Sequence, residues 1–476
     1  MKNGLPGSFA CWPPMPAQPR ERGLATTTRS GRLLLMGRTP VPVSCWQEFK
    51  ERVEELDLEV LCGPLPAWRW WQDAVDDPDT YISLGRRGAP RAVILEGRRH
   101  KRWWMVDSSV WGRRPDASLC RDLSILGEAT GMGQWSTPSR LGDALQRREW
   151  VGERGWRLES RPNAFGRQLL LETGVGGRGE TLELGAKVPH CWEIDQRDAY
   201  AAAWALPKPH GRALRTFDST RVGAGAATAY GPVRFRILQR LGCPGPLPIR
   251  GEDGNLAWPT EPGTYFTHAW AEEVADARAC GIEVSPAGAG VEWSSWVRSG
   301  LWTRRVSELR RTAGGWGSLL KLATVASIGR HGRRPSGWVQ LQRQERPGDL
   351  TFSGTVDKWH GERPLDLPAM THWYSYALMQ ARRRVWHRAV AEQWAGRRVV
   401  AIETDSLVLD GPPLGPVVKR GEDGPGEWSI RREDQTCYTP VTRWAIFSDG
   451  SGRTPGLPFE LRASWLDAHP PPGPSG

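Results

Sequence analysis

The chain has 476 residues, 39% of them hydrophobic, which is enough for two or three domains with packed cores. Its formal net charge of +11 at pH 7 favours a polyanionic partner, although a coding bias towards arginine would produce the same excess. No apolar run approaches the roughly 20 residues that span a bilayer, and no secretory leader is recognisable, so we expect a cytoplasmic protein that does not contact a membrane.

The first third of the chain is predicted to hold an arm and an α/β domain. Residues 1–31 are rich in Pro, Arg, Ser and Thr and lack apolar periodicity, so we expect a disordered arm. Residues 46–59 have a helical pattern, whereas 91–95 and 103–107 are apolar runs of strand length. These elements predict an α/β domain that ends near residue 160.

The next segment is predicted to contain a glycine turn between strands. We expect a strand near Leu169, a turn over 174–178 and a second strand through Leu182 and Leu184. The alternation in Trp192-Glu193-Ile194-Asp195 is typical of a half-buried strand.

Four further elements are predicted from their apolar periodicity and their end signals. They are helices over 199–206, 271–280, 306–327 and 370–394, the second followed by Gly281 and the last by Gly396 as C-caps. The apolar runs 399–402 and 407–409 then flank a polar turn and predict a β-hairpin.

Two carboxylate positions are candidates for chemistry. Asp195 ends a predicted strand and faces the start of a helix, a place suited to a metal or a phosphate. In the hairpin, Glu403 and Asp405 would point to one face by period-two alternation and could hold a divalent cation. The alternative for this hairpin is an ordinary solvated turn.

The cysteines and tryptophans favour structural roles. The eight cysteines are scattered singly without a C-x-x-C pair, so we expect reduced, buried thiols instead of a zinc site or a disulfide framework. The 27 tryptophans could stack on bases, but filling cores is the more common role of this side chain.

Three segments in order resemble the palm motifs of family B DNA polymerases. Residues 195–201 keep the aspartate and the tyrosine of D-x-x-S-L-Y-P, and residues 321–329 keep the lysine and the glycine of K-x-x-x-N-S-x-Y-G. Residues 403–406 correspond to D-T-D-S with glutamate in the first place. This order of motifs is the basis of the resemblance.

The connecting segments agree with the protein-primed and viral branch of that family. Residues 176–180 resemble its G-G-R-x-E linker, residues 207–211 its P-x-P-x-G, and Arg382, Arg383 and Arg384 lie where relatives carry A-x-R. The resemblance covers about residues 165–445.

The resemblance implies a template-directed DNA polymerase that extends a primer by phosphoryl transfer with two Mg²⁺ ions, for which Mn²⁺ can substitute. Asp195 and Asp405 would be the metal-binding catalytic residues, and Glu403 an accessory carboxylate where relatives have aspartate. Because Asp195 and Asp405 are far apart in sequence, the fold must bring them together.

The resemblance also implies which residues bind the deoxynucleoside triphosphate. Lys321 would contact the triphosphate, Gly329 would allow a close approach, and Tyr200 would lie under the sugar and exclude a 2′-hydroxyl. Arg304, Arg310 and Arg311 would assist Lys321. Without the family, Tyr200 reads as a core aromatic and Lys321 as a solvated helix residue.

Four residues are implied to bind primer–template DNA. Gly176, Gly177 and Arg178 would steady the template backbone, and Arg443 is the cation that remains of a K-x-Y segment that holds the primer end. The alternative for the glycines is a plain turn. The priming mode, by a protein or by a nucleic acid, stays open, and the short segment that follows predicts that a processivity partner supplies grip on the product.

Departures from the family pattern leave rival functions open. Val325-Ala326-Ser327-Ile328 replaces N-S-x-Y, which favours a polymerase-fold protein that binds primer–template without catalysis. A metal-dependent nuclease would require a water-activating base that the sequence does not reveal. The retained Asp195, Lys321 and Asp405 favour the polymerase, because clustered carboxylates are destabilising without a function.

Relatives that proofread carry D-x-E in an amino-terminal exonuclease. Asp57-Leu58-Glu59 has that spacing but lies in a predicted helix, and Asp107 has no glutamate two residues on. We therefore expect an amino-terminal domain that is a degenerate relative of an RNase H-like exonuclease, without active proofreading.

The predicted fold is α/β (α+β): a right-hand polymerase with an antiparallel palm sheet, helical fingers and a reduced thumb. The predicted segments in chain order are a disordered arm (1–31), the amino-terminal domain (32–160), the first part of the palm (161–289), the fingers (290–345), the second part of the palm (346–411), the end of the palm with the thumb (412–455) and a disordered tail (456–476).

Overall fold

The computed structural model describes residues 23–27, 33–35, 41–63, 68–77, 80–84, 90–96, 102–112, 117–131, 137–152, 164–216, 222, 228–251, 255–298, 300–332, 340–343, 352–355, 370–419, 424–441 and 443–454. The chain divides into two compact units. Unit 1 comprises Met1–Trp156 and Glu308–Ala369, and unit 2 comprises Arg157–Ser307 and Met370–Gly476.

Unit 1 is built on a six-stranded sheet with the strand order β2-β1-β3-β6-β5-β4. Its strands are β1 (Gly23–Thr27), β2 (Leu33–Leu35), β3 (Leu58–Cys62), β4 (Thr80–Leu84), β5 (Pro90–Glu96) and β6 (Arg102–Asp107). Strands β1, β3 and β6 are parallel, and β6, β5 and β4 form an antiparallel meander. Phe49 and Val53, on one face of α1 (Trp46–Glu55), pack with Val60 of β3.

The other described elements of unit 1 are mostly helices. They are α2 (Trp71–Asp76), η4 (Ser108–Trp111), α3 (Ala117–Thr130), α4 (Pro138–Gly152) and α10 (Gly317–Arg330), with the small hairpin β16 (Gln340–Arg343) and β17 (Phe352–Thr355). Helix α10 lies close against α4, because a Cβ atom at Gly142 would be 2.3 Å from the Ala323 carbonyl oxygen. The buried Ser327 hydroxyl donates to Asp143 Oδ1 over 3.0 Å and links the two helices.

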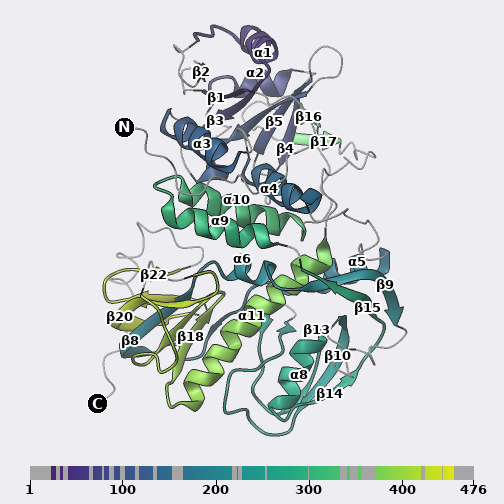
Figure 1. Ribbon diagram of the computed structural model, residues 1–476, viewed down its shortest axis with the longest axis vertical. Coiled ribbons are helices and arrows are strands. Elements are labelled where there is room, and N and C mark those ends of the chain that lie inside the picture. The colour runs from purple at the N-terminus through teal and green to yellow at the C-terminus, as the bar shows by residue number, and fades with distance from the viewer. Residues whose placement is uncertain are drawn as a thin grey trace. The chain divides into compact units, whose positions relative to one another are not determined.

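Unit 2 contains a seven-stranded sheet with the order β22-β21-β20-β8-β19-β18-β7. Its strands are β7 (Gly179–Thr181), β8 (Lys187–Gln196), β18 (Val399–Glu403), β19 (Ser406–Leu409), β20 (Trp428–Tyr438), β21 (Ala445–Phe447) and β22 (Gly452–Arg453). The neighbours are all antiparallel. The long helix α11 (Thr371–Trp394) runs across this sheet (Figure 1).

The two faces of the seven-stranded sheet have separate cores. Val385 and Ala389 of α11 pack with Ile194 and Leu407 on one face. Residues of the opposite face, which include Cys191, Val408 and Cys437, form a second cluster. Because side chains alternate along a strand, residues next to Ile194 on β8 point away from α11.

A second sheet of unit 2 has the order β13-β10-β15-β9, and β14 also pairs with β10. Its strands are β9 (Lys208–Thr216), β10 (Ala229–Ile237), β13 (Gly263–Trp270), β14 (Glu283–Pro286) and β15 (Gly290–Val297). Helix α8 (Ala271–Ala279) packs its apolar side on β10. Unit 2 also contains α5 (Ala164–Thr173), α6 (Ala199–Trp204) and the strand pair β11 (Ile249–Arg250) and β12 (Leu256–Ala257), and α9 (Leu301–Thr312) begins in it.

The structure confirms the predicted α/β class and many of the predicted elements. The predicted helices over 199–206, 271–280 and 370–394 are α6, α8 and α11. Gly281 and Gly396 follow α8 and α11 with φ of +77° and +98°, the left-handed conformation in which glycine ends a helix. The predicted hairpin is β18 and β19, and the strand that carries Asp195 is β8.

Four predicted elements were wrong in type or extent. Residues around Leu169 form α5, because a short apolar run fits a helix as well as a strand. Strand β7 ends at Thr181, before Leu182 and Leu184. The helix predicted over 306–327 is two helices, α9 and α10, separated at Gly314 and Gly315.

The fourth correction concerns the D-x-E segment. Helix α1 ends at Glu55, and Glu59 belongs to strand β3. The register pairs Cys62, at the far end of β3, with Asp107 of β6. Asp57 and Asp107 therefore lie at opposite ends of neighbouring strands, which does not bring them into one cluster.

Two of the predicted segments contain strands at their limits, and two lie wholly or partly outside the described residues. Strand β1 lies within the arm predicted over 1–31, and strand β15 begins at residue 290, where the fingers were predicted to start. Residues 1–22, and the tail predicted over 456–476, lie outside the described residues. The seven described cysteines are all free, and five of them are buried.

Candidate active site

Strand pairing brings the two predicted metal ligands together. Ser406, the first residue of β19, is the register partner of Asp195 on β8. The backbone N–H of Gln196 donates to the carbonyl oxygen of Asp405 over 2.7 Å. Asp195 and Asp405 thus lie at the same end of two adjacent strands, although they are far apart in the sequence.

Glu403 lies on the same side of the sheet as Asp195. Glu403 pairs with Ser406 across β18 and β19, and paired residues of an antiparallel ladder point to the same face. Alternation with Ile194 places this face opposite α11. Glu403 is only 8% exposed, whereas Asp195 and Asp405 are half-buried, so the two aspartates are the more accessible pair.

The turn between β18 and β19 has only two residues, Thr404 and Asp405. The alternation that the sequence suggested for Glu403 and Asp405 is therefore interrupted by the turn. Thr404 has φ of +41°, a conformation that is unfavourable for a β-branched residue and that glycine usually supplies in such hairpins. Strain of this kind is typical of functional sites, where the surrounding contacts maintain it.

The glycine loop 174–178 holds the strained turn from one side. The Thr404 N–H donates to the carbonyl oxygen of Arg178. A Cβ atom at Gly177 would lie 2.7 Å from the Tyr200 hydroxyl and 2.8 Å from Thr404 Cγ2, so only glycine fits there. The predicted residues Gly177 and Tyr200 therefore lie together at the hairpin, whereas a Cβ atom at Gly176 would meet nothing within 4 Å.

The structure does not favour the predicted contact between Arg178 and a template phosphate. The Arg178 side chain is only 1% exposed, and its guanidinium donates to the Gly245 carbonyl over 2.8 Å and pairs with Glu180. It also lies 4.9 Å from the centre of the Trp258 ring. Burial lowers the pKa of Arg178, although Glu180 opposes this. This arginine is a buried anchor for the glycine loop.

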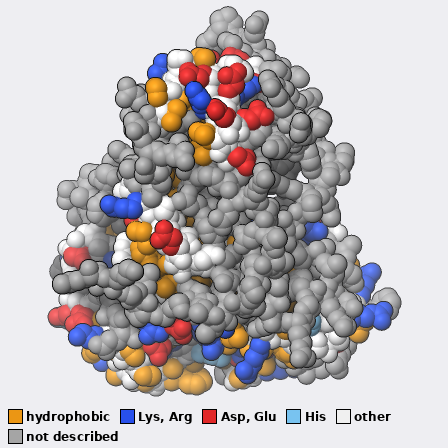
Figure 2. Space-filling view, turned by 45° about the horizontal axis from the view of Figure 1, so that its top comes forward, with side chains coloured by type: hydrophobic (Ala, Val, Ile, Leu, Met, Phe, Trp, Pro, Cys, Tyr) orange, Lys and Arg blue, Asp and Glu red, His pale blue; other side chains and the backbone are white. Residues whose placement is uncertain are grey.

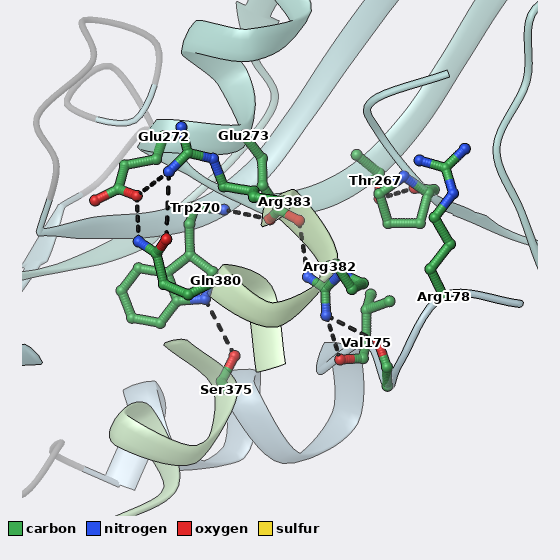
Figure 3. Close-up of polar contacts among 12 residues, drawn as sticks. Val175, Arg178, Thr267, Trp270, Glu272, Glu273, Ser375, Gln380, Arg382 and Arg383 are labelled. Carbon is green, nitrogen blue, oxygen red and sulfur yellow. Dashed lines mark hydrogen bonds and ion pairs between the residues drawn. The ribbon is translucent and has the colours of Figure 1, made fainter. Parts of the chain in front are cut away.

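A second buried arginine fixes the other end of the glycine loop. Arg382 of α11 donates to the carbonyl oxygens of Val175 and Gly176 over 2.6 and 3.0 Å, and to Glu273 of α8 over 2.8 Å (Figure 3). Glu273 in turn accepts the Trp270 N–H at the start of α8. Arg382 therefore links α8, α11 and the loop that contacts the carboxylate hairpin.

The next arginine of α11 completes this network of charges. Arg383 makes two hydrogen bonds with Asp276, of 2.6 and 3.0 Å. It also pairs with Glu272, which accepts a hydrogen bond from Gln380 (Figure 3). Although burial of Asp276 opposes it, the contacts with His387 and Arg383 lower the pKa of this carboxyl. Opposite charges thus hold α8 on α11.

The loop after Asp195 is tied to the turn that precedes β20. Gln196 Nε2 donates to the Gly426 carbonyl over 2.9 Å, and the Gly426 N–H donates to the Arg197 carbonyl over 2.7 Å. Asp198, with φ of +47°, accepts from the Ser307 hydroxyl of α9 over 3.0 Å. These bonds fix the backbone immediately beyond the strand end that carries Asp195.

The predicted nucleotide-binding residues fall into both units. Arg304 is exposed on the part of α9 that belongs to unit 2, with Asp195 and Tyr200. Arg310 and Arg311, at the end of α9, and Lys321 and Gly329, on α10, belong to unit 1.

The predicted residues of α10 lie on an open side of the helix. Lys321 and Val325 are exposed, and a Cβ atom at Gly329 would meet nothing within 4 Å. The spacing of four residues puts all three on one side of the helix.

Arg443 lies beside the carboxylate hairpin, at the edge strand of the sheet. Its Nε atom would be 2.8 Å from a Cβ atom at Gly179, and Gly179 is the register partner of Glu403. The Arg443 N–H donates to Thr181 Oγ1 over 2.8 Å, and Arg443 has φ of +69°. The exposed cation therefore lies near the face to which Glu403 contributes.

The donor set suits a hard divalent cation that shares its shell with a ligand. Among the described residues, no group of three or more His, Cys, Asp or Glu side chains is placed to hold a metal ion. Mg²⁺ is commonly bound by one or two carboxylates and completes its octahedron with water and substrate phosphates. Asp195 and Asp405 fit this mode of binding. No described helix is long and apolar enough to cross a membrane.

Sequence reasoning missed several residues that the fold brings to the site. The structural roles of Arg178 and Arg382 depend on contacts with Gly245 and Glu273, which are remote in sequence and give no local signal. Arg384 was predicted only as part of the arginine run, and it lies beside the Gly426 turn, where a Cβ atom at Gly426 would be 2.6 Å from Arg384 Nη1. Thr404 could not be identified, because positive φ at a threonine is contrary to its preference.

No protein-family model matches the sequence, and no curated protein matches it. Solved structures do show the same fold. Phi29 DNA polymerase in an orthorhombic crystal form has a TM-score of 0.64 at 12% identity, over 92% of this chain and 90% of that chain. Phi29 DNA polymerase complexed with primer–template DNA has a TM-score of 0.66 at 11% identity, over 93% and 94%. At this identity the similarity establishes the fold alone.

Proposed function

We propose that the protein is a template-directed DNA polymerase that adds deoxynucleotides to a primer 3′ end. The observation that carries this proposal is the register of β8 and β19, which places Asp195 and Asp405 at one strand end beside the strained Thr404 turn. Like-charged carboxylates at adjacent positions are destabilising unless a cation binds them. The fold of phi29 DNA polymerase, whose complexes with primer–template DNA and incoming nucleotides have been solved, supports the same function.

Asp195 and Asp405 would hold two Mg²⁺ ions, and Mn²⁺ could substitute for them. When bound, such ions stabilise the attacking and leaving oxygens of phosphoryl transfer. The protein's own part is to fix the backbone that carries the two carboxylates, through the β8–β19 register and the hydrogen bond from the Gln196 N–H to the Asp405 carbonyl oxygen. Glu403 is buried on the same face, where it adds negative charge without being as accessible.

The substrates would be a DNA primer–template and deoxynucleoside triphosphates. Tyr200 is half-buried with its hydroxyl beside Gly177 and the turn, a position from which it can pack under a sugar and exclude a 2′-hydroxyl. Lys321, with Arg304, Arg310 and Arg311, would bind the triphosphate, and Gly329 would leave room for the nascent base pair. The exposed Arg443 would contact the primer strand.

A second candidate is a protein that keeps the polymerase fold and binds primer–template without catalysis. It is favoured by Val325, which is 43% exposed on the side of α10 that carries Lys321, where relatives have a polar residue. An apolar side chain there cannot make the hydrogen bonds of that polar residue. Nucleotide affinity would then be low even if Asp195 and Asp405 bind a metal.

Primer extension distinguishes these functions. We would compare the wild type, Asp405→Asn and Asp434→Asn on a primed single-stranded DNA with Mg²⁺ or Mn²⁺ and four deoxynucleotides. Asp434 is an exposed carboxylate on β20 and serves as the control. We expect extension by the wild type and by Asp434→Asn, and a loss of about 1,000-fold or more in Asp405→Asn. Primer–template binding by a wild type that does not extend the primer would support the second candidate.

A further inference from the structure

Two cysteines of unit 2 lie against each other although they are far apart in the sequence. Cys243 and Cys280 pack in one cluster with Trp386 and Val390 of α11, and both are free thiols. Their side chains form a hydrogen bond in which the Cys280 thiol is the donor. A buried single thiol acts as a small apolar side chain, whereas two thiols in contact can also exchange with a disulfide.

A second pair of cysteines in the same unit is fully enclosed. Cys191 of β8 and Cys437 of β20 also interact with each other, but both are 0% exposed in the core of the seven-stranded sheet. Cys280, by contrast, is half-buried at the C-terminal end of α8, and Cys243 is 8% exposed. A small reagent in solution can therefore reach the Cys243–Cys280 pair in the folded protein, whereas the enclosed pair is shielded from it.

The surroundings of Cys243 favour the thiolate, which is the reactive form of cysteine. The hydrogen bond from Cys280 and, to a lesser degree, the charge of Arg178 lower the pKa of Cys243 to about 7, although burial opposes this. The same hydrogen bond, together with burial, raises the pKa of Cys280. The described surface in Figure 2 carries charges of both signs interspersed, so these adjacent groups, and not a broad positive surface, favour the thiolate. Cys243 is thus the nucleophile of the pair.

The segment that contains Cys243 supports the glycine loop of the candidate active site. The Pro244 carbonyl accepts the Trp386 Nε1–H over 2.7 Å, and the Gly245 carbonyl accepts from Arg178 over 2.8 Å. The backbone of Arg178 in turn accepts an N–H of the carboxylate hairpin. The cysteine pair therefore lies beside the contacts that hold the hairpin in place.

Cys280 is fixed by helix α8. It caps the C-terminal end of this helix, where its N–H donates to the Asp276 and Ala277 carbonyls over 3.2 and 3.1 Å. The Asp276 carboxylate is bound by Arg383 of α11 over 2.6 and 3.0 Å. Both thiols therefore extend from backbone that other contacts already order. A bond between Cys280 and Cys243 would mainly restrict the unfolded chain, which is how a disulfide stabilises a protein.

We propose that Cys243 and Cys280 form a redox site that is reversibly oxidised to a disulfide by a small-molecule disulfide. The Cys243 thiolate attacks one sulfur of the reagent, forms a mixed disulfide and releases one thiolate. Cys280 then gives its proton to solvent and attacks the Cys243 sulfur, which forms the Cys243–Cys280 bond and releases the second thiolate. Two cysteines are thus oxidised and one disulfide is reduced. The site requires no catalysis and is independent of the proposed polymerase activity.

Peptide mapping after oxidation tests the site directly. The reduced full-length protein would be incubated with oxidised glutathione at pH 7.5, alkylated with N-ethylmaleimide, digested and analysed by mass spectrometry. We expect two peptides joined through Cys243 and Cys280, with the loss of two hydrogens, and their separation by a thiol reductant. In Cys280→Ser the reaction should stop at a glutathione adduct on Cys243, because the serine hydroxyl can still donate to the thiolate but cannot form the second bond.

Other cysteines of the chain serve as internal controls. Cys191 and Cys437 should stay reduced in the folded protein and become alkylated only after denaturation, because both are fully buried. Cys45 is exposed, and we expect it to form a glutathione adduct without a protein disulfide. The melting temperature of reduced Cys280→Ser, compared with the reduced wild type, shows whether this variant folds.

Oxidation should also raise the melting temperature. The bond would close the loop from Cys243 to Cys280, so we expect a rise of about 5 °C in the oxidised wild type and none in Cys280→Ser. A Cys243–Cys280 disulfide that forms while Cys191 and Cys437 stay reduced supports the site even if the wild type does not extend primers. A pair that stays reduced, or that oxidises only together with the enclosed pair, would overturn the proposal, because oxidation would then require unfolding.

Discussion

Two regions of unit 2 differ in how their carboxylates are arranged. Between α8 and α11, each carboxylate lies against an arginine, as in the pairs Glu273–Arg382 and Asp276–Arg383. At the end of β8 and β19, the fold instead places Asp195 and Asp405, two residues of like charge, at the same end of adjacent strands. Like charges at neighbouring positions are unfavourable unless a cation binds them, whereas removing one partner of a buried ion pair is destabilising.

The difference separates contacts that support the fold from a pair of carboxylates that contributes nothing comparable to it and is therefore a candidate for chemistry. The two regions are connected, because Arg382 also holds the carbonyl groups of Val175 and Gly176. The glycine loop then contacts Thr404 and Tyr200 through Gly177. The paired charges thus provide the rigidity that the strained carboxylate turn requires.

Removal of Arg382 should cause the largest loss of stability. The Arg382→Ala change leaves Glu273 as a buried carboxylate without this arginine and frees two loop carbonyls, so we expect the free energy of unfolding to fall by about 3–5 kcal/mol. Chemical denaturation would measure it. Arg383→Ala is the matched comparison, and because Arg383 and Glu272 are each 20% exposed it should cost less. Equal losses would show that the link from Arg382 to the glycine loop adds nothing.

The contact at Gly177 should matter more for activity than for folding. In Gly177→Ala the new methyl group would lie 2.7 Å from the Tyr200 hydroxyl and 2.8 Å from Thr404 Cγ2, so the loop or the turn must shift. We expect about 1–3 kcal/mol of destabilisation and a fall in the extension rate of about 100-fold. Gly176→Ala is the control, because its methyl group would meet nothing within 4 Å. A similar fall in both variants would argue for backbone flexibility as the cause.

The sequence predicted the carboxylates of the site better than the residues that hold them in place. Asp195 was identified at the end of an alternating strand pattern and Asp405 in a polar turn between two apolar runs, and the order of motifs resembles a known family. Their proximity follows from strand pairing, which local pattern does not specify, so only the register of Asp195 and Ser406 shows it. Whether these residues bind metal stays a prediction.

The residues and elements that surround the site were missed for identifiable physical reasons. The resemblance implied that Arg178 contacts the template backbone, yet Trp258 and Gly245 from a distant segment cover it. The apolar run at Leu169 fits both a helix and a strand, and packing decides for α5. The break at Gly314 and Gly315 was readable in the sequence, since two glycines in succession are unfavourable inside a helix.

Neutralising Asp405 should raise the free energy of unfolding, whereas Arg382→Ala should lower it. In EDTA, Asp405→Asn removes a like charge near Asp195, so we expect the free energy of unfolding to rise by about 1 kcal/mol. Mg²⁺ should raise the melting temperature of the wild type but not of Asp405→Asn, because the proposed function requires Asp405 for tight binding of the ion. A destabilised Asp405→Asn in EDTA would mean that the carboxylate has a structural role, and the contrast between the two regions would fail.

The smallest expected effect concerns His268 of β13, outside both charged regions. Burial lowers the pKa of His268, so the folded protein favours the neutral ring and the unfolded chain binds more protons below about pH 6.5. Stability from this group is therefore full above that pH and is lost as the pH falls through it. Melting temperatures at pH 7.5 and 5.5 should differ less for His268→Gln than for the wild type. The neutral ring lies beside Tyr230 and Phe266 and has no part in the network of α8 and α11, so Arg383→Ala should leave this pH dependence in place.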